Sequence, residues 1–158
     1  MERITDSNKK DFSYMELAVK EAKKSSCNQA HCGSVIVKDG IIIGKGYNSP
    51  PGDKESQRRC NFQKKDFNEK ITDKTCCIHA EQRAIMDALS SNKNKIKGSV
   101  LYFVRIDESA KKINASKPYC SICSKMALDV GISKFVLWND GLDFYETEEY
   151  NNLTYSYS

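Results

Sequence analysis

The chain has 158 residues, a formal net charge of +4 and a hydrophobic content of 39%. This length fits one domain with a single core, and interspersed charges of both signs are typical of a soluble globular protein. No apolar run approaches the roughly 20 residues that cross a membrane, and the first residues lack the basic and apolar segments of a secretory signal. We therefore expect a single domain over residues 1–158, located in the cytoplasm and without membrane contact.

The charge distribution favours a small anionic ligand over nucleic acid. Lysines gather in two stretches, 93–97 and 111–112, but short lysine runs between periodic segments are typical of solvated loops. A net charge of +4 is small for a protein that follows a nucleic-acid backbone, although it suits a nucleotide. We therefore expect a small-molecule partner and no nucleic acid.

The first half of the chain predicts a helix, a hairpin and a long loop. Apolar residues at helical spacing predict an amphipathic helix of about twelve residues that ends near residue 25, namely Phe12, Met15, Val19 and Ala22. Two β-branched stretches, 33–38 and 41–46, flank Asp39-Gly40, a strong signal for a two-residue hairpin turn. Residues 50–75 are polar and without sustained periodicity, so they predict a long loop.

The second half alternates helices with strands. A stripe of small residues at helical spacing predicts a helix that begins near His79, and a further helix opens at Cys120 and ends at Gly131. The helix after Cys120 connects two short apolar strands, which should therefore be parallel. The remaining segments are, in chain order, a polar loop at 92–97, a strand at 100–104, a polar loop at 106–117, a strand at 134–138 and an acidic, tyrosine-rich tail at 139–158 with a short helix at 143–151.

Four residues carry the chemistry. His79, Cys120 and Cys123 offer one imidazole and two thiol ligands, and three protein ligands are typical of a catalytic zinc site whose fourth position is open to water. Zinc-bound water is acidified towards neutrality and becomes a nucleophile. The spacing of three puts both sulfurs on one helix face, where the helix N-terminus favours thiolates. Glu81 is placed to take a proton from that water and to deliver it to a leaving amine.

These motifs resemble those of the zinc-dependent cytidine/deoxycytidylate deaminase superfamily, and the deoxycytidylate branch is the more similar. The H-x-E run at residues 79–81 and the two cysteines after Pro118 carry the resemblance, which covers residues 12–138. It implies a three-layer α/β/α cytidine deaminase-like fold with a mixed sheet, and substrate contacts from Asn48 and Ala80. Two features depart from the family pattern: Tyr119 interrupts the usual Pro-Cys step, and residues 139–158 match no pattern of the family.

Seven cysteines are many for a cytoplasmic protein, where clustered cysteines indicate metal before disulfides. Some deoxycytidylate deaminases carry an additional structural zinc, and the resemblance implies that one Zn²⁺ is catalytic and that a second is structural. The residues in comparable positions are Cys27, Cys60, Cys76 and Cys77, which His31 and Cys32 could join. The alternative is that these cysteines are free thiols packed as small apolar side chains.

The expected reaction is the zinc-dependent hydrolytic deamination of a cytosine nucleotide, with dCMP converted to dUMP and ammonia. Alternatives among enzymes are the deamination of cytidine, guanine, a riboflavin-pathway pyrimidine or a tRNA adenosine. The alternative of another class is an inactive zinc-stabilised binding protein, which would have no use for Glu81. Relatives commonly oligomerise, so we expect a homo-oligomer. Candidate phosphate ligands by chain position are Lys24, Arg58, Arg59 and Arg105.

Overall fold

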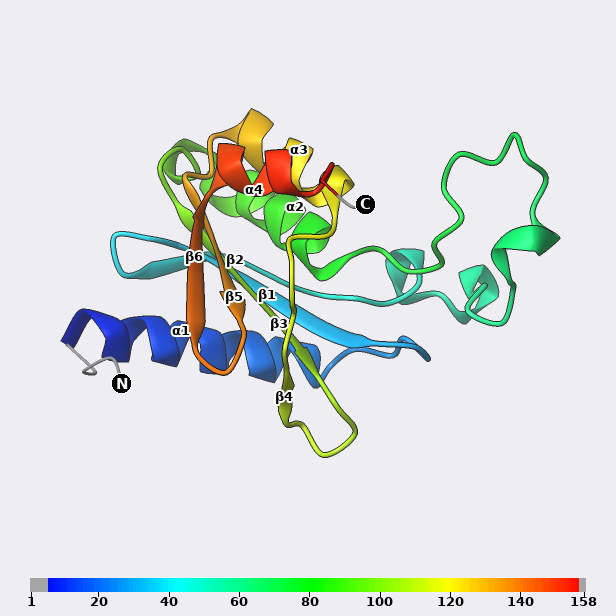
Figure 1. Ribbon diagram of the computed structural model, residues 1–158, viewed down its shortest axis with the longest axis horizontal. Helices are drawn as coiled ribbons and strands as arrows, with labels where there is room; N and C mark the ends of the chain where they lie inside the picture. The colour runs from blue at the N-terminus through cyan, green and yellow to red at the C-terminus, as the bar shows by residue number, and fades with distance from the viewer. Residues whose placement is uncertain (1–5, 157–158) are drawn as a thin grey trace.

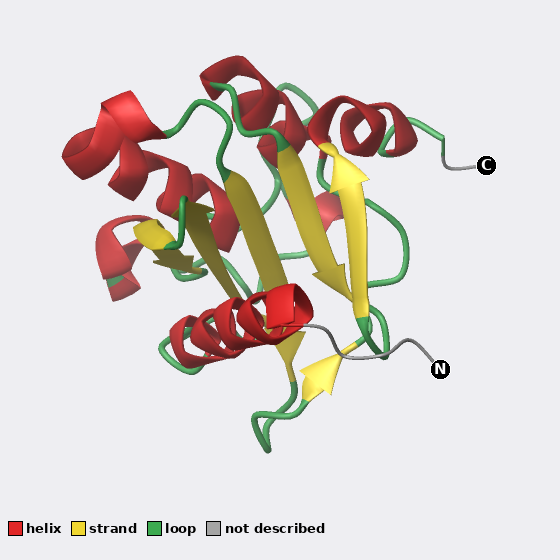
Figure 2. Cartoon of the chain, turned by 90° about the vertical axis from the view of Figure 1, so that its left-hand side faces the viewer, coloured by secondary structure: helices red, strands yellow, loops and turns green. Residues whose placement is uncertain are grey.

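A computed structural model describes residues 6–156 as one mixed sheet between two layers of helices (Figures 1 and 2). Helix α1 covers one face of the sheet, and α2, α3 and α4 cover the other. The three-layer α/β/α fold expected from the sequence is therefore confirmed. The elements are α1 Asp6–Ala22, β1 His31–Lys38, β2 Ile41–Tyr47, α2 Ala80–Asn92, β3 Val100–Ile106, β4 Lys112–Ile113, α3 Ser121–Val130, β5 Lys134–Trp138, β6 Leu142–Glu146 and α4 Thr147–Leu153.

The sheet has the strand order β2-β1-β3-β5-β6, and β4 pairs with the end of β3. Strands β1 and β2 form the predicted hairpin, in which Asp39 (φ 50°) and Gly40 (φ 78°) both take positive φ, as a type I′ turn requires. Strands β3 and β5 are parallel, as the strand–helix–strand unit predicted. Gly131 ends α3 in the left-handed conformation with φ 91°.

Each face of the sheet buries its own apolar cluster. One cluster joins α1 to β1, β3 and β5 and includes Met15, Val35 and Val104. The other lies beneath α2, α3 and α4 and includes Ile85 and Phe135. The candidate site residues described below lie at the edge of the layer formed by α2, α3 and α4. The two clusters hold the sheet and helices that position these residues. Within residues 6–156, no helix is long and apolar enough to cross a membrane.

Two glycines of β2 bring α2 directly onto the sheet. A Cβ atom at Gly46 would lie 2.3 Å from the carbonyl oxygen of Ala80, and one at Gly44 would lie 2.4 Å from that of Ala84. Only a residue without a side chain allows this approach. Because Ala80 follows His79, the contact at Gly46 fixes the start of α2 against the sheet.

Several boundaries differ from the sequence-based expectation. Helix α1 begins at Asp6 and ends at Ala22 rather than near residue 25. The loop at 106–117 contains the two-residue strand β4, which is too short to show a periodicity. The expected helix at 143–151 is wrong in its first half: residues 142–146 form β6, which pairs with β5 through a turn at Asp140-Gly141, and only 147–153 are helical.

Residues 50–78, which we call the insert, extend away from the sheet beyond α2 (Figure 1). As expected, they hold no strand longer than a bridge; they contain three short 3₁₀ helices, Pro51–Asp53, Glu55–Gln57 and Lys64–Asp66. The end of the insert returns to the body through a bridge in which Ile78 N donates to Ser49 O at 2.9 Å. This bridge places His79 at the start of α2.

Candidate metal and catalytic site

The structure brings His79, Cys120 and Cys123 together although 41 residues separate the first two. The Nδ1 atom of His79 lies 3.2 Å from each of the two sulfurs, and the sulfurs lie 3.0 Å apart. One imidazole nitrogen and two sulfurs that converge on one point form a donor set that suits Zn²⁺. The residues present therefore fit a three-ligand zinc site.

Both ligand-bearing helices begin at the site. His79 directly precedes α2, and its backbone N–H donates to Oε1 of Gln82 at 2.9 Å. Cys120 is the N-cap of α3, and its sulfur accepts the backbone N–H of Cys123 at 3.4 Å. The cap fixes the direction of the Cys120 side chain, while the first turn of α3 brings Cys123 to the same side.

The ligands shift one another's protonation. A hydrogen bond from Cys123, followed by the nearby His79, lowers the pKa of Cys120. The same thiolate raises the pKa of His79 to about 9. Cys123 has a raised pKa because it donates to Cys120 and is buried. A cation at this site would replace these shared protons, since metal ligands bind as thiolates and as neutral imidazole.

Glu81 lies beside the three ligands and is only 5% exposed. Burial, reinforced by the negative charge of Cys120, raises its pKa to about 7, although the nearby His79 opposes this shift. Glu81 lines the same cavity as His79 and Cys120. A carboxyl group in this position has the reach and the proton affinity of a general acid and base.

Asn48 and Ala80, the two expected substrate contacts, both line the same cavity. The Asn48 side chain is mostly engaged with the protein: Oδ1 accepts from Ser25 Oγ at 2.6 Å and from Cys32 N at 2.8 Å, and Nδ2 donates to Ala30 O at 2.8 Å. An amide NH₂ group carries two hydrogens, so one N–H remains for a ligand. Asn48 therefore also holds the loop before β1 in place.

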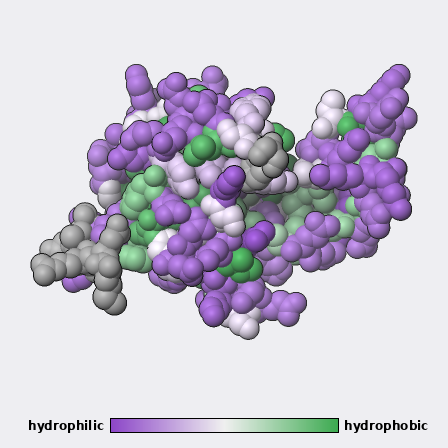
Figure 3. All heavy atoms as spheres, in the orientation of Figure 1, coloured by the Kyte–Doolittle hydropathy of each residue, from purple (hydrophilic) through white to green (hydrophobic). Residues whose placement is uncertain are grey.

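A cavity of about 870 Å³ opens from the site towards the insert. Figure 3 shows a mainly hydrophilic surface that is hollowed between the body and the insert. Among the described residues that line the cavity, Glu81 is the one carboxylate, whereas five are cationic: Arg59, Lys64, Lys74, Arg105 and Lys117. Its walls therefore favour an anionic ligand.

The four phosphate candidates differ in position. Arg59 and Arg105 line the cavity. Lys24 instead pairs with Glu21 at 3.0 Å, and Arg58 pairs with Glu55 through two hydrogen bonds of 2.7 Å. Periodicity gave no indication of Lys64, Lys74 or Lys117, because they lie in loops whose course depends on the fold.

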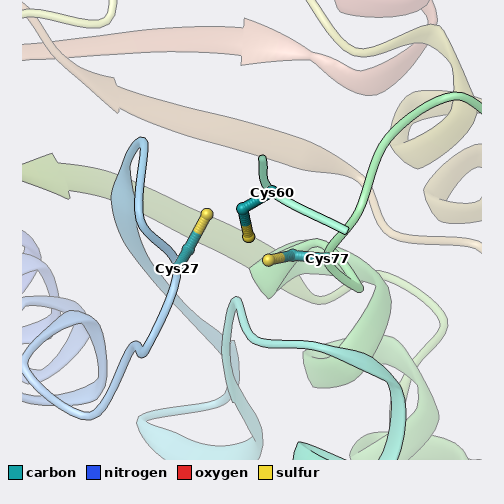
Figure 4. A group of neighbouring side chains, drawn as sticks. All are labelled: Cys27, Cys60 and Cys77. Atoms are coloured by element: carbon teal, nitrogen blue, oxygen red, sulfur yellow. The ribbon is translucent and has the colours of Figure 1, made fainter. Parts of the chain in front are cut away.

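A second group of sulfurs lines the same cavity. Cys27, Cys60 and Cys77 point their sulfur atoms towards one another, and these atoms all lie within 4.8 Å (Figure 4). Cys76 joins them through a contact of 3.3 Å between its sulfur and that of Cys60. Arg58 Nη1 lies 3.4 Å from the sulfur of Cys60. The loop after α1 thus meets two parts of the insert, at residue 60 and at residues 76–77, and the four cysteines expected at a second metal site are neighbours.

His31 and Cys32 do not belong to this second group. Cys32 lines the cavity between the two groups, and burial raises the pKa of its thiol to about 12. Tyr150 is a cavity residue that sequence reasoning did not single out; it lies on α4 and is 4% exposed. Its position depends on the packing of the C-terminal helix, which no local pattern predicts.

Comparison with known proteins identifies the family. Residues 8–139 match the family described as "Cytidine and deoxycytidylate deaminase zinc-binding region". Deoxycytidylate deaminase from Mycobacterium phage D29 is 27% identical over 132 residues, which are 80% of this chain and 91% of that protein. The enzyme of the same name from Saccharomyces cerevisiae is 28% identical over 131 residues, or 80% of this chain, and the one from Schizosaccharomyces pombe is 32% identical over 83 residues, or 49%. The chain spans only 36% and 25% of these two yeast proteins.

Solved structures share the fold. The dCMP deaminase from cyanophage S-TIM5, in complex with dCMP and dUMP, has a TM-score of 0.57 at 24% identity, with 84% of this chain and 82% of that one covered. Cytidine deaminase from Burkholderia pseudomallei has a TM-score of 0.57 at 16% identity, with 88% and 94% covered. The family match over residues 8–139 includes His79, Glu81, Cys120 and Cys123. The chain therefore belongs to the cytidine and deoxycytidylate deaminase family.

Proposed function

We propose that this protein is a zinc-dependent deaminase that hydrolyses dCMP to dUMP and ammonia. The observation that carries the proposal is the convergence of His79, Cys120 and Cys123 beside the buried carboxyl group of Glu81, at the floor of a cavity with cationic walls. A closed structural zinc site would have a fourth protein ligand in place of the cavity.

His79, Cys120 and Cys123 would hold the zinc ion, which supplies an acidified water as the nucleophile. Glu81 would accept a proton from this water, give a proton to the ring nitrogen of cytosine, and then protonate the departing amino group. A raised pKa suits this role because the carboxyl group can both take and release a proton near neutral pH. The balance is one water consumed and one ammonia released for each dCMP.

The polar groups around the floor would hold the base. Asn48 has one amide N–H left for the substrate, and its other bonds fix that N–H in direction. Ala80 is fully buried at the start of α2, and its small side chain leaves room for a ring beside it. Both roles follow from the resemblance to the family and agree with the place of these residues in the cavity wall.

The cationic wall favours a nucleotide over a nucleoside. Arg59, Arg105 and Lys117 come from different segments and face one cavity, so a phosphate group could contact more than one of them, and charge-assisted hydrogen bonds are the stronger kind. Supporting this choice, three of the relatives are deoxycytidylate deaminases, and the S-TIM5 structure was solved with dCMP and dUMP.

The second cysteine group supports a structural zinc held by Cys27, Cys60, Cys76 and Cys77. Four sulfur ligands are typical of a closed structural site. Such an ion would join the loop after α1 to residues 60, 76 and 77 of the insert and so shape the part of the cavity wall that these cysteines line. A single domain over residues 1–158, a homo-oligomeric assembly and a cytoplasmic location complete the proposal.

Ammonia release from the zinc-loaded protein tests the function. The panel contains cytosine, guanine and adenine as bases, nucleosides and monophosphates, and Glu81→Gln is the matched control. Turnover of dCMP that is lost in the control would support both the chemistry and the substrate. Turnover of another member alone would retain the mechanism and refute dCMP as the substrate. If zinc is bound and no member of the panel is turned over, the proposal that the substrate is a small molecule of this kind is refuted.

A further inference from the structure

Arg83 is a cationic residue of α2 that takes no part in the proposed reaction. It lies one helical turn after His79, and its backbone N–H donates to the carbonyl oxygen of His79 at 3.0 Å. Its side chain reaches the end of β2, where Nη1 donates to the carbonyl oxygen of Tyr47 at 2.6 Å and to Ser49 Oγ at 2.7 Å. These two acceptors flank Asn48 in the sequence. One side chain of α2 therefore holds the residues on both sides of Asn48.

Further contacts fix the Arg83 side chain and its two acceptors. The guanidinium carbon lies 5.0 Å from the centroid of the Tyr47 ring, a distance that suits a cation–π interaction. The Ser49 hydroxyl donates in turn to the carboxylate of Asp53, and the Tyr47 hydroxyl donates to the other oxygen of that carboxylate at 2.8 Å. Ser49 is fully buried, so water cannot readily replace its partners. The segment 47–49 is thus bonded to a cation of α2 and to an anion of the insert.

The bonds of the Asn48 amide itself do not relate it to α2. Its partners lie before β1 or at the start of that strand: Ser25, Ala30 and Cys32. Glu81, by contrast, lies in the first turn of α2. The geometry between Asn48 and Glu81 therefore depends on contacts that tie the segment 47–49 to this helix. The backbone bridge from Ile78 to Ser49 is one such contact, and Arg83 supplies the side-chain contacts.

We propose that Arg83 is a positioning residue for Asn48: it ties both neighbours of Asn48 to α2 and thereby directs the remaining amide N–H towards a substrate held at Glu81. This inference rests on the proposed function, in which Asn48 contacts the substrate. Among the described residues, those that line the cavity include Asn48 and Glu81 but not Arg83. Arg83 therefore influences the substrate through Asn48 and makes no contact of its own with it.

Arg83→Gln tests the proposal in zinc-loaded, full-length Glu81→Gln protein, which should bind dCMP without turning it over. Calorimetry gives the dissociation constant for dCMP, which we expect Arg83→Gln to raise by about 10–100-fold. Repeated with Asn48→Ala also present, the same change should have less than about a twofold effect, because the residue through which it acts is gone. Asp87→Ala is the matched control: Asp87 Oδ2 accepts the backbone N–H of Lys45 at 2.9 Å, a contact between the same two elements one turn further from the site. It should change the affinity by less than about twofold.

An unchanged affinity for dCMP in folded Arg83→Gln protein would overturn the proposal, as would an equal loss in Asp87→Ala. A loss of the same size with and without Asn48→Ala would also overturn it, because Arg83 would then act independently of Asn48. Loss of zinc from Arg83→Gln, measured by metal analysis, would place its role at the metal site instead. If Arg83→Gln does not fold, Arg83→Lys replaces it and the same outcomes decide.

Failure of the proposed function gives a different result. If the zinc-loaded Glu81→Gln parent does not bind dCMP, the proposed substrate is refuted, and the role of Arg83 is refuted with it. If the parent binds dCMP and the effects of Arg83→Gln and Asn48→Ala are additive, only the role of Arg83 is refuted.

Discussion

Gly46→Ala tests whether the contact between β2 and α2 sets the geometry of the site. The new Cβ atom would lie 2.3 Å from Ala80 O and 2.5 Å from Ala84 N, while real Cβ atoms essentially never approach closer than 3.0 Å. The helix must therefore move by about 0.7 Å, the difference between 3.0 Å and 2.3 Å. Overpacking of this kind typically costs about 1–3 kcal/mol of unfolding free energy.

The displacement should reach the catalytic residues, because Ala80 lies between His79 and Glu81. A misplacement of about 1 Å can reduce a rate on the order of 100-fold. We therefore expect kcat for dCMP in folded Gly46→Ala protein to fall by up to about 100-fold. Denaturant unfolding gives the stability, and kcat is then measured at a temperature at which the variant is folded.

Gly44→Ala is the matched control. Its Cβ atom would clash with the same helix, 2.4 Å from Ala84 O, but one turn further from the ligands. We expect a similar loss of stability and a smaller loss of kcat. A Gly46→Ala protein with wild-type stability and wild-type kcat would refute the reasoning about close approach. Equal losses of kcat in the two variants would refute the link between the start of α2 and the site.

Three further predictions concern the charges and ligands. Glu81→Gln should lower kcat by about 10²–10⁴-fold with zinc content unchanged by metal analysis and no loss of thermal stability, because a buried carboxyl group is replaced by a neutral one; loss of zinc in this variant would contradict the assignment as acid and base. Arg105→Gln should raise KM for dCMP roughly tenfold and leave KM for deoxycytidine unchanged, so an equal rise for both substrates would exclude a phosphate contact. Cys77→Ser should reduce the bound zinc from two equivalents to one and lower the unfolding temperature, and two equivalents in this variant would contradict a site at Cys77.

The parts of the fold that were predicted from the sequence depend on short-range patterns. Asp39-Gly40 predicted the hairpin because a type I′ turn needs positive φ at both positions, which these residue types tolerate. Cys120 and Cys123 predicted the first turn of α3, since their spacing of three is a local property of a helix.

The misassigned segments depend on long-range contacts. Residues 142–146 form an edge strand because β5 offers hydrogen bonds to them, and their sequence does not alternate clearly. Their turn, Asp140-Gly141, has the same residue types as the turn of the first hairpin, and this pair is the one local feature that indicates a second hairpin. The stacking of Tyr150 on Phe135 joins residues that no periodicity relates, and it follows only from the packing of α4 on the sheet.

The charges at the zinc site and on the cavity wall have different roles in binding an anionic substrate. A Zn²⁺ ion with two thiolate ligands is formally neutral, and Glu81 adds at most one negative charge, so the loaded catalytic site would not itself attract a phosphate group. Cys32 adds no charge either, because burial raises the pKa of its thiol to about 12. Attraction for an anionic substrate must therefore come from the wall, where Arg59, Lys64 and Lys74 of the insert line the same cavity as Arg105 and Lys117 of the body. Part of that wall lies next to the second cysteine group, so loss of its metal should weaken nucleotide binding before it affects the rate of the chemical step.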